Sequence, residues 1–223
     1  MSQTKQRPLL EPEAIQLLAQ YGIPYPKQEL AHNADEAGRF AERIGCPVVL
    51  KVVSPDVLHK SDAGGVMVNL TSAAAVHDGY ASMMKTVLSK ALGAKIDGAL
   101  VVQQAPQGLE VIVGAIDDVT FGPTLMFGLG GIFTEILKDV AFRVAPIERR
   151  DAEEMIQEIK AYKLLTGVRG QAPRDIPALV ELLLSVSRLL TEHPEIKELD
   201  LNPIRLYEKG LMALDARVLV KEA

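Results

Sequence analysis

A lysine inside an apolar run, followed eight residues later by a histidine, is the pattern in this chain with the clearest chemical meaning. Residues 48–53 have the β-branched density of a mostly buried strand, so Lys51 must extend its ammonium group to water or meet a fixed anion such as nucleotide phosphate. His59 then offers an imidazole that can attack or accept a phosphoryl group, while Lys60 and Ser61 offer a cation and a hydroxyl donor. The pattern predicts a phosphate-handling loop directly after the strand.

Two glycines close this loop. Gly64 and Gly65 let the backbone approach a ligand closely or turn with a positive φ. Taken singly, a strand lysine is usually a surface lysine and a loop histidine usually takes no part in chemistry. The prediction therefore depends on residues elsewhere in the chain.

Oxygen-bearing side chains end two apolar segments near the C-terminus. Residues 198–203 and 211–217 are expected to form two strands of a hairpin, across which Asn202 and Asp215 can meet. Mg²⁺ usually takes one or two protein oxygens and completes its octahedron with water and nucleotide phosphates, so the pair suits Mg·ATP. The alternative is that Asn202 starts an Asx-Pro turn and Asp215 pairs with Arg217.

A glycine-rich bend forms a weaker signal. Gly128, Gly130 and Gly131 precede residues 132–137, and closely spaced glycines allow backbone amides to line an anion or a partner loop. Arg143 adds a forked, permanently charged phosphate donor. The spacing matches neither a dinucleotide fingerprint nor a Walker loop.

Further residues can border a nucleotide. Gln103 and Gln104 lie at the end of an expected strand, beside Ala105, where they can bound an adenine or ribose site, and Glu110 can lie near the phosphates or the metal. Taken singly, each is more often a solvated residue at a strand end. His32, His77 and His193 have no partners at metal-ligand spacing and are interpreted as structural or surface groups.

The elements that must position these residues can be read from periodicity and caps. Because sequential strands are joined mostly by short turns, we expect an α+β fold with mixed or antiparallel sheets. Expected helices cover residues 11–21, 33–45, 72–91, 152–162 and 175–192, and expected strands cover 48–53, 66–70, 99–104, 110–116, 123–127, 197–206 and 211–218.

Composition limits the class of protein. The chain has 223 residues, of which 48% are hydrophobic, so it can bury one large core or two smaller ones. A net charge of −5 argues against a general nucleic-acid or membrane-surface binder. Cys46 is the single cysteine, interpreted as a packing residue, and fits a reducing compartment. The first residues lack an apolar signal core, so a cytoplasmic location is expected.

Together these segments resemble the ATP-grasp, or beta, subunit of ADP-forming acetyl-CoA synthetases, relatives of the succinyl-CoA synthetase beta subunit. The resemblance implies an ATP-grasp fold, with a helical segment at 1–22 and two subdomains at 23–105 and 106–223 that hold a nucleotide between their sheets. The segments that carry it are residues 49–66, 128–139, 142–146, 198–203 and 214–217.

The resemblance also implies roles for individual residues. His59 matches a transiently phosphorylated histidine of ADP-forming acyl-CoA synthetases, which succinyl-CoA synthetases lack at this position. The other implied roles are nucleotide binding for Lys51, phosphate binding for Lys60 and Ser61, a place near the phosphates for Glu110, and Mg²⁺ binding for Asn202 and Asp215. Gln103 departs from the glutamate that relatives often place at the hinge, which leaves the nucleotide preference open.

The implied reaction converts acyl-CoA, ADP and phosphate into a carboxylic acid, CoA and ATP. Phosphoryl passes from a histidine of a CoA-binding alpha subunit to His59 and then to Mg·ADP, because in-line transfer requires the reacting atoms to lie about 3 to 3.5 Å apart. Residues 1–223 supply no CoA site, so the chain is expected to need the alpha subunit, in a heterotetramer. The residues of this chain do not indicate which acyl group is transferred.

Two rival functions remain. An ATP-grasp carboxylate–amine ligase transfers phosphate directly to a carboxylate and needs no histidine relay, so His59 argues against it. A regulatory nucleotide-binding module would need no catalytic residues, and the presence of His59, Asn202 and Asp215 makes it less favoured.

Overall fold

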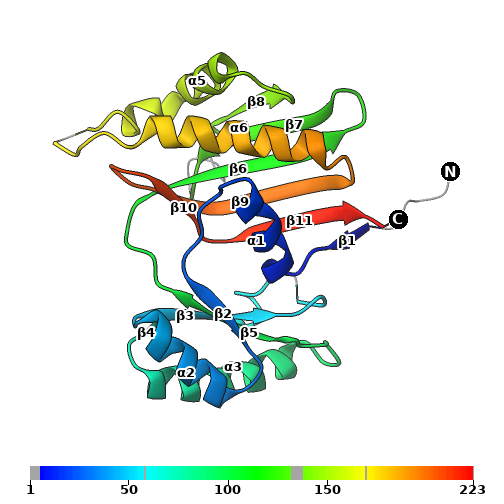
Figure 1. Ribbon diagram of the computed structural model, residues 1–223, viewed down its shortest axis with the longest axis vertical. Helices are drawn as coiled ribbons and strands as arrows, with labels where there is room; N and C mark the ends of the chain where they lie inside the picture. Colours follow the sequence, from blue (N-terminus) through cyan, green and yellow to red (C-terminus); the bar gives the residue numbers. More distant parts are fainter. Residues whose placement is uncertain (1–5, 58, 132–137, 169, 223) are drawn as a thin grey trace. The chain divides into compact units, whose positions relative to one another are not determined.

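The computed structural model describes residues 6–57, 59–131, 138–168 and 170–222 (Figure 1). The chain forms two compact units, one made of residues 1–25 and 107–223 and the other of residues 26–106. We call them the outer unit and the inserted unit. Each unit has its own sheet and its own hydrophobic core. The three-part division expected from the sequence stays a prediction.

The inserted unit is a four-stranded antiparallel sheet with two helices on one face. The side chains of Leu50, Val52 and Met83 are among those that fill its core, because alternate residues of the buried strands point toward the helices. In order across the sheet, the strands are β2 (Gln28–Ala31), β5 (Gly98–Gln103), β3 (Val48–Val53) and β4 (Val66–Leu70), and the helices are α2 (Ala34–Ile44) and α3 (Ala73–Lys90).

Both helices of the inserted unit begin at the caps that the sequence predicts. Asn33 accepts a hydrogen bond from the backbone N–H of Glu36 at 2.9 Å, and Ser72 accepts one from that of Ala75 at 3.2 Å. Each bond satisfies a backbone donor that the first helical turn leaves without an intrahelical partner. The predicted start of these two helices is confirmed.

The outer unit contains a seven-stranded antiparallel sheet. The path across it is β1 (Gln6–Pro8), β11 (Ala216–Lys221), β9 (Ile196–Leu206), β6 (Leu109–Asp118), β7 (Gly122–Leu129) and β8 (Val140–Val144), with β10 (Leu211–Ala213) paired to β9. The helices are α1 (Glu11–Gln20), α5 (Arg149–Glu158) and α6 (Ile176–Glu192), with a 3-10 turn at Lys160–Leu164. The α+β class with antiparallel sheets is confirmed.

The two faces of this larger sheet differ. Helices α1, α5 and α6 cover one face, where Leu125, Phe127 and Leu129 of β7 are buried in the core (Figure 1). Side chains between these positions point to the opposite face, which we call the far face. Val111 and Val113 lie on the core side of β6, so Glu110 and Ile112 belong to the far face.

Two predicted elements differ from the structure. The helix expected at 152–162 begins earlier and is α5, which ends before Lys160, because buried Asp139 accepts hydrogen bonds from the backbone N–H groups of Lys160 and Ala161 at 2.8 Å each. The strand expected at 211–218 is interrupted between β10 and β11. Because of this break, Asp215 lies in the connection between the two strands and is not part of either one.

Other expectations concern smaller features. Strands β1 and β2 were not expected, because three or four mostly polar residues give no alternation signal. Cys46 is exposed, so its interpretation as a packing residue is wrong.

Residues 132–137 lie outside the described residues. Among the helices that the structure describes, none is both long enough and apolar enough to cross a membrane.

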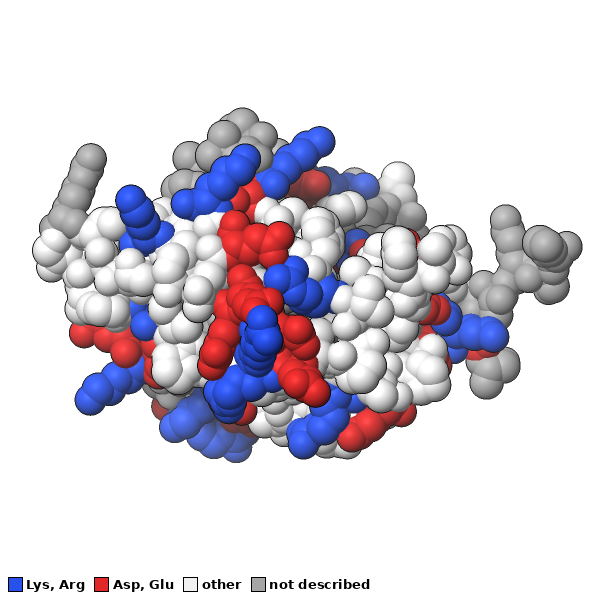
Figure 2. Space-filling model, turned by 90° about the horizontal axis from the view of Figure 1, so that it is seen from above, with Lys and Arg blue, Asp and Glu red and all other residues white. Residues whose placement is uncertain are grey.

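Charges of both signs are mixed on the surface seen in Figure 2. On α5, for example, Arg149 pairs with Glu181 of α6, and Arg150 pairs with Glu154 at 2.7 Å. Exposed pairs of this kind contribute little stability, typically below about 1 kcal/mol. Their interleaving keeps this face from carrying a field of one sign.

Candidate functional site

Lys51 lies in the middle of a central strand of the inserted unit. It pairs with Leu100 of β5 and with Val66 of β4, and it is 9% exposed. Leu50 and Val52, on either side, point into the core beneath α2 and α3. Lys51 therefore lies on the sheet face away from these helices, where the strand fixes the base of its long side chain.

The loop after β3 is a compact turn held by its own backbone. The N–H of Gly65 donates to the carbonyl of Lys60 at 2.7 Å, and the N–H of Val52 donates to the carbonyl of Gly65 at 2.8 Å. A Cβ at Gly65 would lie 2.3 Å from Cγ1 of Val52, so only glycine allows this return to the strand. His59 and Ser61 are exposed on the turn and Lys60 is half-buried.

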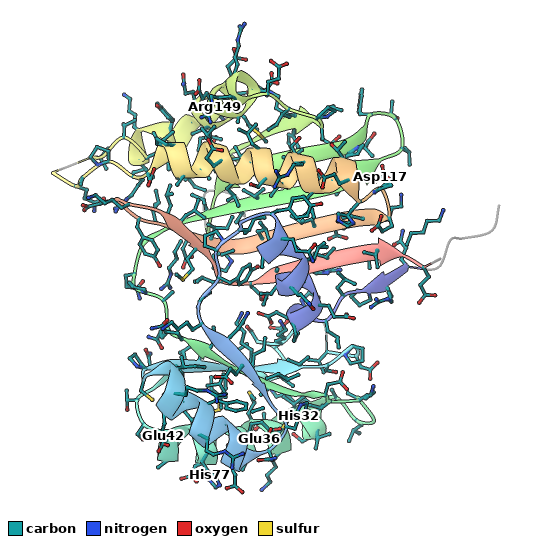
Figure 3. All side chains as sticks on the ribbon, viewed as in Figure 1. His32, Glu36, Glu42, His77, Asp117 and Arg149 are labelled. Carbon is teal, nitrogen blue, oxygen red and sulfur yellow. The ribbon has the colours of Figure 1, made fainter. Side chains whose placement is uncertain are left out.

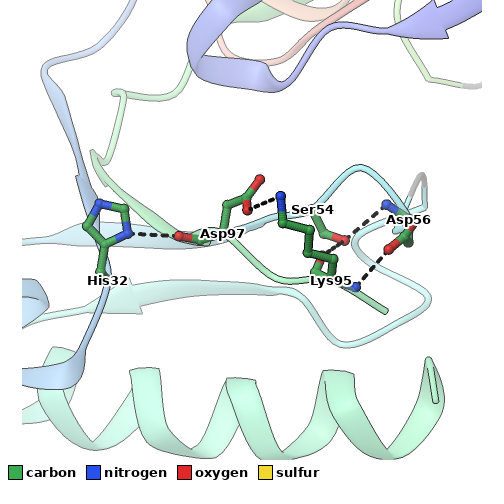
Figure 4. A network of polar contacts seen from close by, with 5 residues as sticks. All are labelled: His32, Ser54, Asp56, Lys95 and Asp97. Atoms are coloured by element: carbon green, nitrogen blue, oxygen red, sulfur yellow. Dashed lines mark hydrogen bonds and ion pairs between the residues drawn. The ribbon is translucent and has the colours of Figure 1, made fainter. Parts of the chain in front are cut away.

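A polar network anchors the start of this loop (Figure 4). The Ser54 hydroxyl donates to the carbonyl of Lys95 at 2.6 Å and accepts from the N–H of Asp56 at 3.1 Å. The Asp56 carboxylate in turn accepts from the N–H of Lys95 at 2.7 Å. His32 and Asp97 extend the network, because Nδ1 of His32 lies 2.8 Å from the Asp97 carbonyl oxygen. The start of the loop is thus tied to the segment that leads into β5, and its end is tied to β3.

Three of the four histidines have polar partners. The ring of His32 contacts Asp97, Nδ1 of His77 lies 3.0 Å from the Asp78 carboxylate, and Nδ1 of His193 lies 2.8 Å from that of Glu195. Figure 3 places His32 and His77 at separate points of the inserted unit. Their interpretation as structural or surface groups stays a prediction. For His59, the part of the chain that the structure describes offers no hydrogen bond or ion pair to the ring.

The predicted nucleotide-border residues lie at the other end of β3. Gln103 ends β5 opposite Val48, roughly 10 Å along the strand from Lys51 at about 3.3 Å per residue. Its side chain is exposed and Ala105 is half-buried in the connection that follows. The neighbouring Gln104 instead bonds Asn69, donating to its Oδ1 at 2.6 Å. Gln103 is therefore the exposed amide of the two.

Glu110 and the glycine bend meet in the outer unit. The N–H of Gly130 donates to the carbonyl of Glu110 at 2.8 Å, and a Cβ at Gly130 would lie 3.0 Å from Cβ of Glu110. Gly128 pairs with Ile112 on the far face, and the exposed Gly131 has a φ of +64°. Glu110 also lies 3.5 Å from Nη2 of Arg205. The structure brings Glu110 and the bend together.

Arg143 lies on the other side of the sheet. It pairs with Leu125, which is buried beneath the helices, and its guanidinium contacts the Glu158 carboxylate of α5 at 2.8 Å. The structure therefore does not bring Arg143 together with Glu110 or Gly128. Side chains alternate between the two faces along a strand, and directly paired residues face the same side. Arg143 therefore faces the helices together with Leu125, whereas Glu110 and Gly128 belong to the far face.

Asn202 and Asp215 come together, as the hairpin argument predicts. Ala216 pairs with Leu201, so Asp215 and Asn202 are the next two opposed residues beyond the ladder. The backbone N–H of Ala216 donates to the Asp215 carboxylate at 3.0 Å. Asn202 is exposed and lies at a bulge, where the pairing of β9 with β6 shifts register.

Asp200 belongs to the same cluster, although the sequence argument gave it no role. Burial raises the pKa of Asp200, and the negative charges of Glu198 and Asp215 raise it further, against the lowering effects of Arg217 and of a hydrogen bond with Asn202. The signal that could have found it is the i, i+2 spacing to Asn202, which places two strand residues on one face.

The cluster suits a divalent cation. Among the described residues, no group of three or more His, Cys, Asp or Glu side chains could hold a metal ion. One carboxylate and one amide oxygen nevertheless suffice for Mg²⁺ that keeps its water and phosphate ligands. The mutual charge of Asp200 and Asp215 favours a cation here.

The sequence matches the ATP-grasp domain family over residues 1–220. The beta subunit of acetate–CoA ligase [ADP-forming] I from Pyrococcus furiosus is 49% identical over 219 residues, which cover 98% of this chain and 94% of that subunit. The chain therefore belongs to the ATP-grasp domain family, and it is similar over nearly its whole length to a beta subunit of an ADP-forming acetate–CoA ligase.

Solved structures agree with this membership. Acetyl-coenzyme A synthetase 1 of Ca. Korarchaeum cryptofilum, in complex with coenzyme A, Ca-AMPCP and HgCl+, superimposes with a TM-score of 0.94 at 49% identity, covering 96% of this chain and 94% of that chain. A second structure of that enzyme contains coenzyme A and Mg-AMPPCP, with a phosphohistidine segment pointing towards the nucleotide binding site. It has a TM-score of 0.85 at 47% identity and covers 96% of this chain and 93% of that one.

Proposed function

We propose that this chain is the nucleotide-binding beta subunit of an ADP-forming acyl-CoA ligase. The reaction is acyl-CoA + ADP + phosphate ⇌ carboxylic acid + CoA + ATP. The observation that carries the proposal is the 49% identity to such a beta subunit over almost the whole of both chains. The exposed His59, on a turn closed by backbone hydrogen bonds beyond buried Lys51, supports it further.

In this proposal His59 carries the phosphoryl group between two sites. An imidazole nitrogen of His59 attacks the phosphorus of a phosphohistidine in the partner subunit, and the P–N bond to that histidine breaks. An oxygen of ADP's terminal phosphate then attacks the phosphorus on His59, which forms ATP and releases the imidazole. The exposed position of His59 on a loop held by hydrogen bonds at both ends supports this role.

The remaining site residues bind the nucleotide. Lys51, Lys60 and Ser61 are proposed to contact phosphate oxygens, and Gln103 and Ala105 to border the adenine or ribose. Glu110, with Gly128, Gly130 and Gly131, is proposed to line the phosphate or partner side of the site. Arg143 was predicted to join them, but it pairs with Glu158 on the other side of the sheet.

Asn202 and Asp215 are proposed to hold Mg²⁺ with their side-chain oxygens. When bound, the cation neutralises charge on the nucleotide phosphates. The positions of Asn202 and Asp215, which oppose each other just beyond the pairing of β11 with β9, support this assignment. We also propose a CoA-binding alpha subunit as the partner, and a cytoplasmic location.

Calorimetry of the full chain with ADP, with and without Mg²⁺, tests the proposal. We expect wild-type protein to bind Mg·ADP, and Asp215→Ala to lose the Mg²⁺-dependent part of the binding while remaining folded. Asp78→Ala is a matched control, because Asp78 is an exposed aspartate on α3 of the inserted unit.

A folded wild-type chain that binds no ADP in the presence of Mg²⁺ would overturn the proposed function. Equal Mg²⁺ dependence in wild type and Asp215→Ala would overturn only the metal assignment.

A further inference from the structure

A pocket opens in the outer unit where the turn between β9 and β10 meets the start of α6. Its volume is about 430 Å³, within the range of about 300–1,000 Å³ that is common for pockets that hold small molecules. The residues that line it are Gln107, Arg174, Tyr207, Glu208 and Lys209. None of the described residues that we propose to bind phosphate or Mg²⁺ is among them. The proposed reaction therefore makes no use of this pocket.

Backbone hydrogen bonds fix the walls of the pocket. The N–H of Arg174 donates to the carbonyl of buried Leu165 at 2.8 Å. The N–H of Asp175 donates to the carbonyl of Tyr207 at 2.9 Å, which joins the start of α6 to the end of β9. The N–H of Tyr207 donates to the carbonyl of Gly210 at 3.0 Å and so closes the turn between β9 and β10. The side chains that line the pocket thus extend from fixed backbone positions.

The guanidinium of Arg174 has no counter-charge in the part of the chain that the structure describes. Its Nε is buried, and none of the described residues accepts a hydrogen bond from that nitrogen or forms an ion pair with the guanidinium. A charged group that is partly removed from water is costly unless an acceptor or an opposite charge meets it. A negatively charged group in the pocket would supply that partner.

Lys209 brings a second positive charge to the same pocket. It is exposed on the turn and, among the described residues, forms no ion pair. Glu208 also lines the pocket, but it is exposed to water and pairs with neither cation in the described chain. The carboxylate of neighbouring Asp175 accepts hydrogen bonds from two backbone N–H groups. The charges of Arg174 and Lys209 thus remain available to a ligand.

We propose that this pocket binds a phosphate group, supplied by inorganic phosphate or by a small phosphate ester. A phosphate group carries about 1.5 to 2 negative charges at pH 7, which two cations match, whereas a carboxylate carries one. The planar fork of Arg174 suits two phosphate oxygens, and Lys209 acts as a point charge. The amide of Gln107 can donate to another oxygen. This site goes beyond the proposed function, because that function assigns these residues no role.

Calorimetry of the full chain tests the proposal by measuring the binding of inorganic phosphate, ribose 5-phosphate and acetate. We expect Arg174→Gln to weaken phosphate binding about ten- to a hundred-fold, the usual effect of losing a hydrogen bond between charged groups. Glu208→Gln should strengthen it, because a repelling charge is removed. Arg150→Gln is the matched control, since Arg150 is exposed on α5 and pairs with Glu154 at 2.7 Å.

Comparison of the three probes identifies the source of the phosphate group. Tighter binding of ribose 5-phosphate than of inorganic phosphate supports a phosphate ester as the ligand, and equal or weaker binding supports free phosphate. Acetate that binds as tightly as phosphate would overturn the proposal, because charge matching predicts a preference for the phosphate group.

Lys60→Ala separates this pocket from the proposed nucleotide site. Phosphate binding that is lost in Lys60→Ala and kept in folded Arg174→Gln would overturn the proposal, as would a folded wild-type chain that binds no phosphate. Circular dichroism checks that each variant is folded. If Arg174→Gln does not fold, Lys209→Gln on the exposed turn replaces it, and an unchanged phosphate affinity in that variant would overturn the proposal. None of these outcomes depends on the binding of ADP.

Discussion

His59 differs from the other three histidines in what surrounds its ring. His32, His77 and His193 each lie within hydrogen-bond distance of an oxygen in the folded chain. The ring of His59 is exposed on a turn whose backbone is fixed by Gly65 and Lys60. A carrier of phosphoryl groups needs this combination, because the nucleophilic nitrogen must be accessible while its base stays in place.

We predict that His59→Ala abolishes formation of ATP from acyl-CoA, ADP and phosphate when the partner subunit is present. Phosphorylation of the partner's histidine should continue, because that step precedes transfer to His59. A hydrogen-bonding role would cost only about 1.5–3 kcal/mol, or roughly ten- to a hundred-fold. Rapid-quench labelling with [γ-³²P]ATP measures acid-labile, base-stable label on this chain.

His77→Ala is the control for this experiment, because His77 is half-exposed on α3, where its ring lies 3.0 Å from the Asp78 carboxylate and 3.5 Å from that of Asp35. The label should persist in the control and disappear in His59→Ala. If wild type carries no such label and His59→Ala keeps several per cent of its activity, direct transfer from the partner histidine to ADP replaces the relay.

At the level of elements, the N-terminus of α6 locks the hairpin that leads to Asp215. The Asp175 carboxylate accepts from the N–H of Ala178 at 3.0 Å, as a helix cap, and from the N–H of Gly210 at 2.7 Å. The N–H of Asp175 donates to the carbonyl of Tyr207 at 2.9 Å. One side chain therefore joins a helix to the turn between β9 and β10.

These bonds make a stability contribution that depends on pH. The hydrogen bond from Gly210 and then that from Ala178 lower the pKa of Asp175 below its ordinary value. The folded state thus favours the ionised Asp175 carboxylate. The stabilisation that this carboxylate gives is present above the unfolded-state pKa and is lost as the pH falls through the folded-state pKa. We predict that Asp175→Ala lowers the free energy of unfolding at pH 7 by about 1–2 kcal/mol.

Urea unfolding of wild type and Asp175→Ala between pH 7 and pH 3 measures this difference, which should shrink as the pH falls. Asp78→Ala again serves as the exposed control. A difference that stays constant down to pH 3 would contradict the assignment to the ionised carboxylate.

At the level of the whole molecule, the predicted site residues divide between two units. Lys51, His59, Lys60, Ser61, Gln103 and Ala105 belong to the inserted unit, while Glu110, Asn202 and Asp215 belong to the outer unit. Residues 26–106 interrupt the outer unit in the sequence, and each unit buries its own core. Each unit thus positions its own share of the predicted site residues.

We predict that the purified chain alone does not form ATP from acyl-CoA, ADP and phosphate, and that a CoA-binding partner subunit restores the reaction. The reason is that the proposed phosphoryl donor is a histidine of that partner. A coupled ATP assay with each polypeptide alone and with both together measures this. ATP formation by this chain without any other polypeptide would contradict the prediction.

The sequence by itself determined most elements and the grouping of residues that are near one another in the chain. Lys51, His59 and Gly65 share one strand and its loop, so β-branched density and glycine placement were sufficient to predict them. Local hydrogen bonds also made the caps at Asn33 and Ser72 predictable. Asn202 and Asp215 could be paired because a short turn sets the register of a hairpin.

The tertiary structure decided what depends on contacts between distant segments. Asp139 ends α5 through two hydrogen bonds that cross 21 and 22 residues of sequence. Pairing with Leu125 turns Arg143 toward α5 and away from Glu110, and a backbone hydrogen bond from Ala213 to Pro24 brings the start of the chain beside the end of β10. Such contacts are set by the packing of whole elements, and propensity and periodicity report only on near neighbours in the chain.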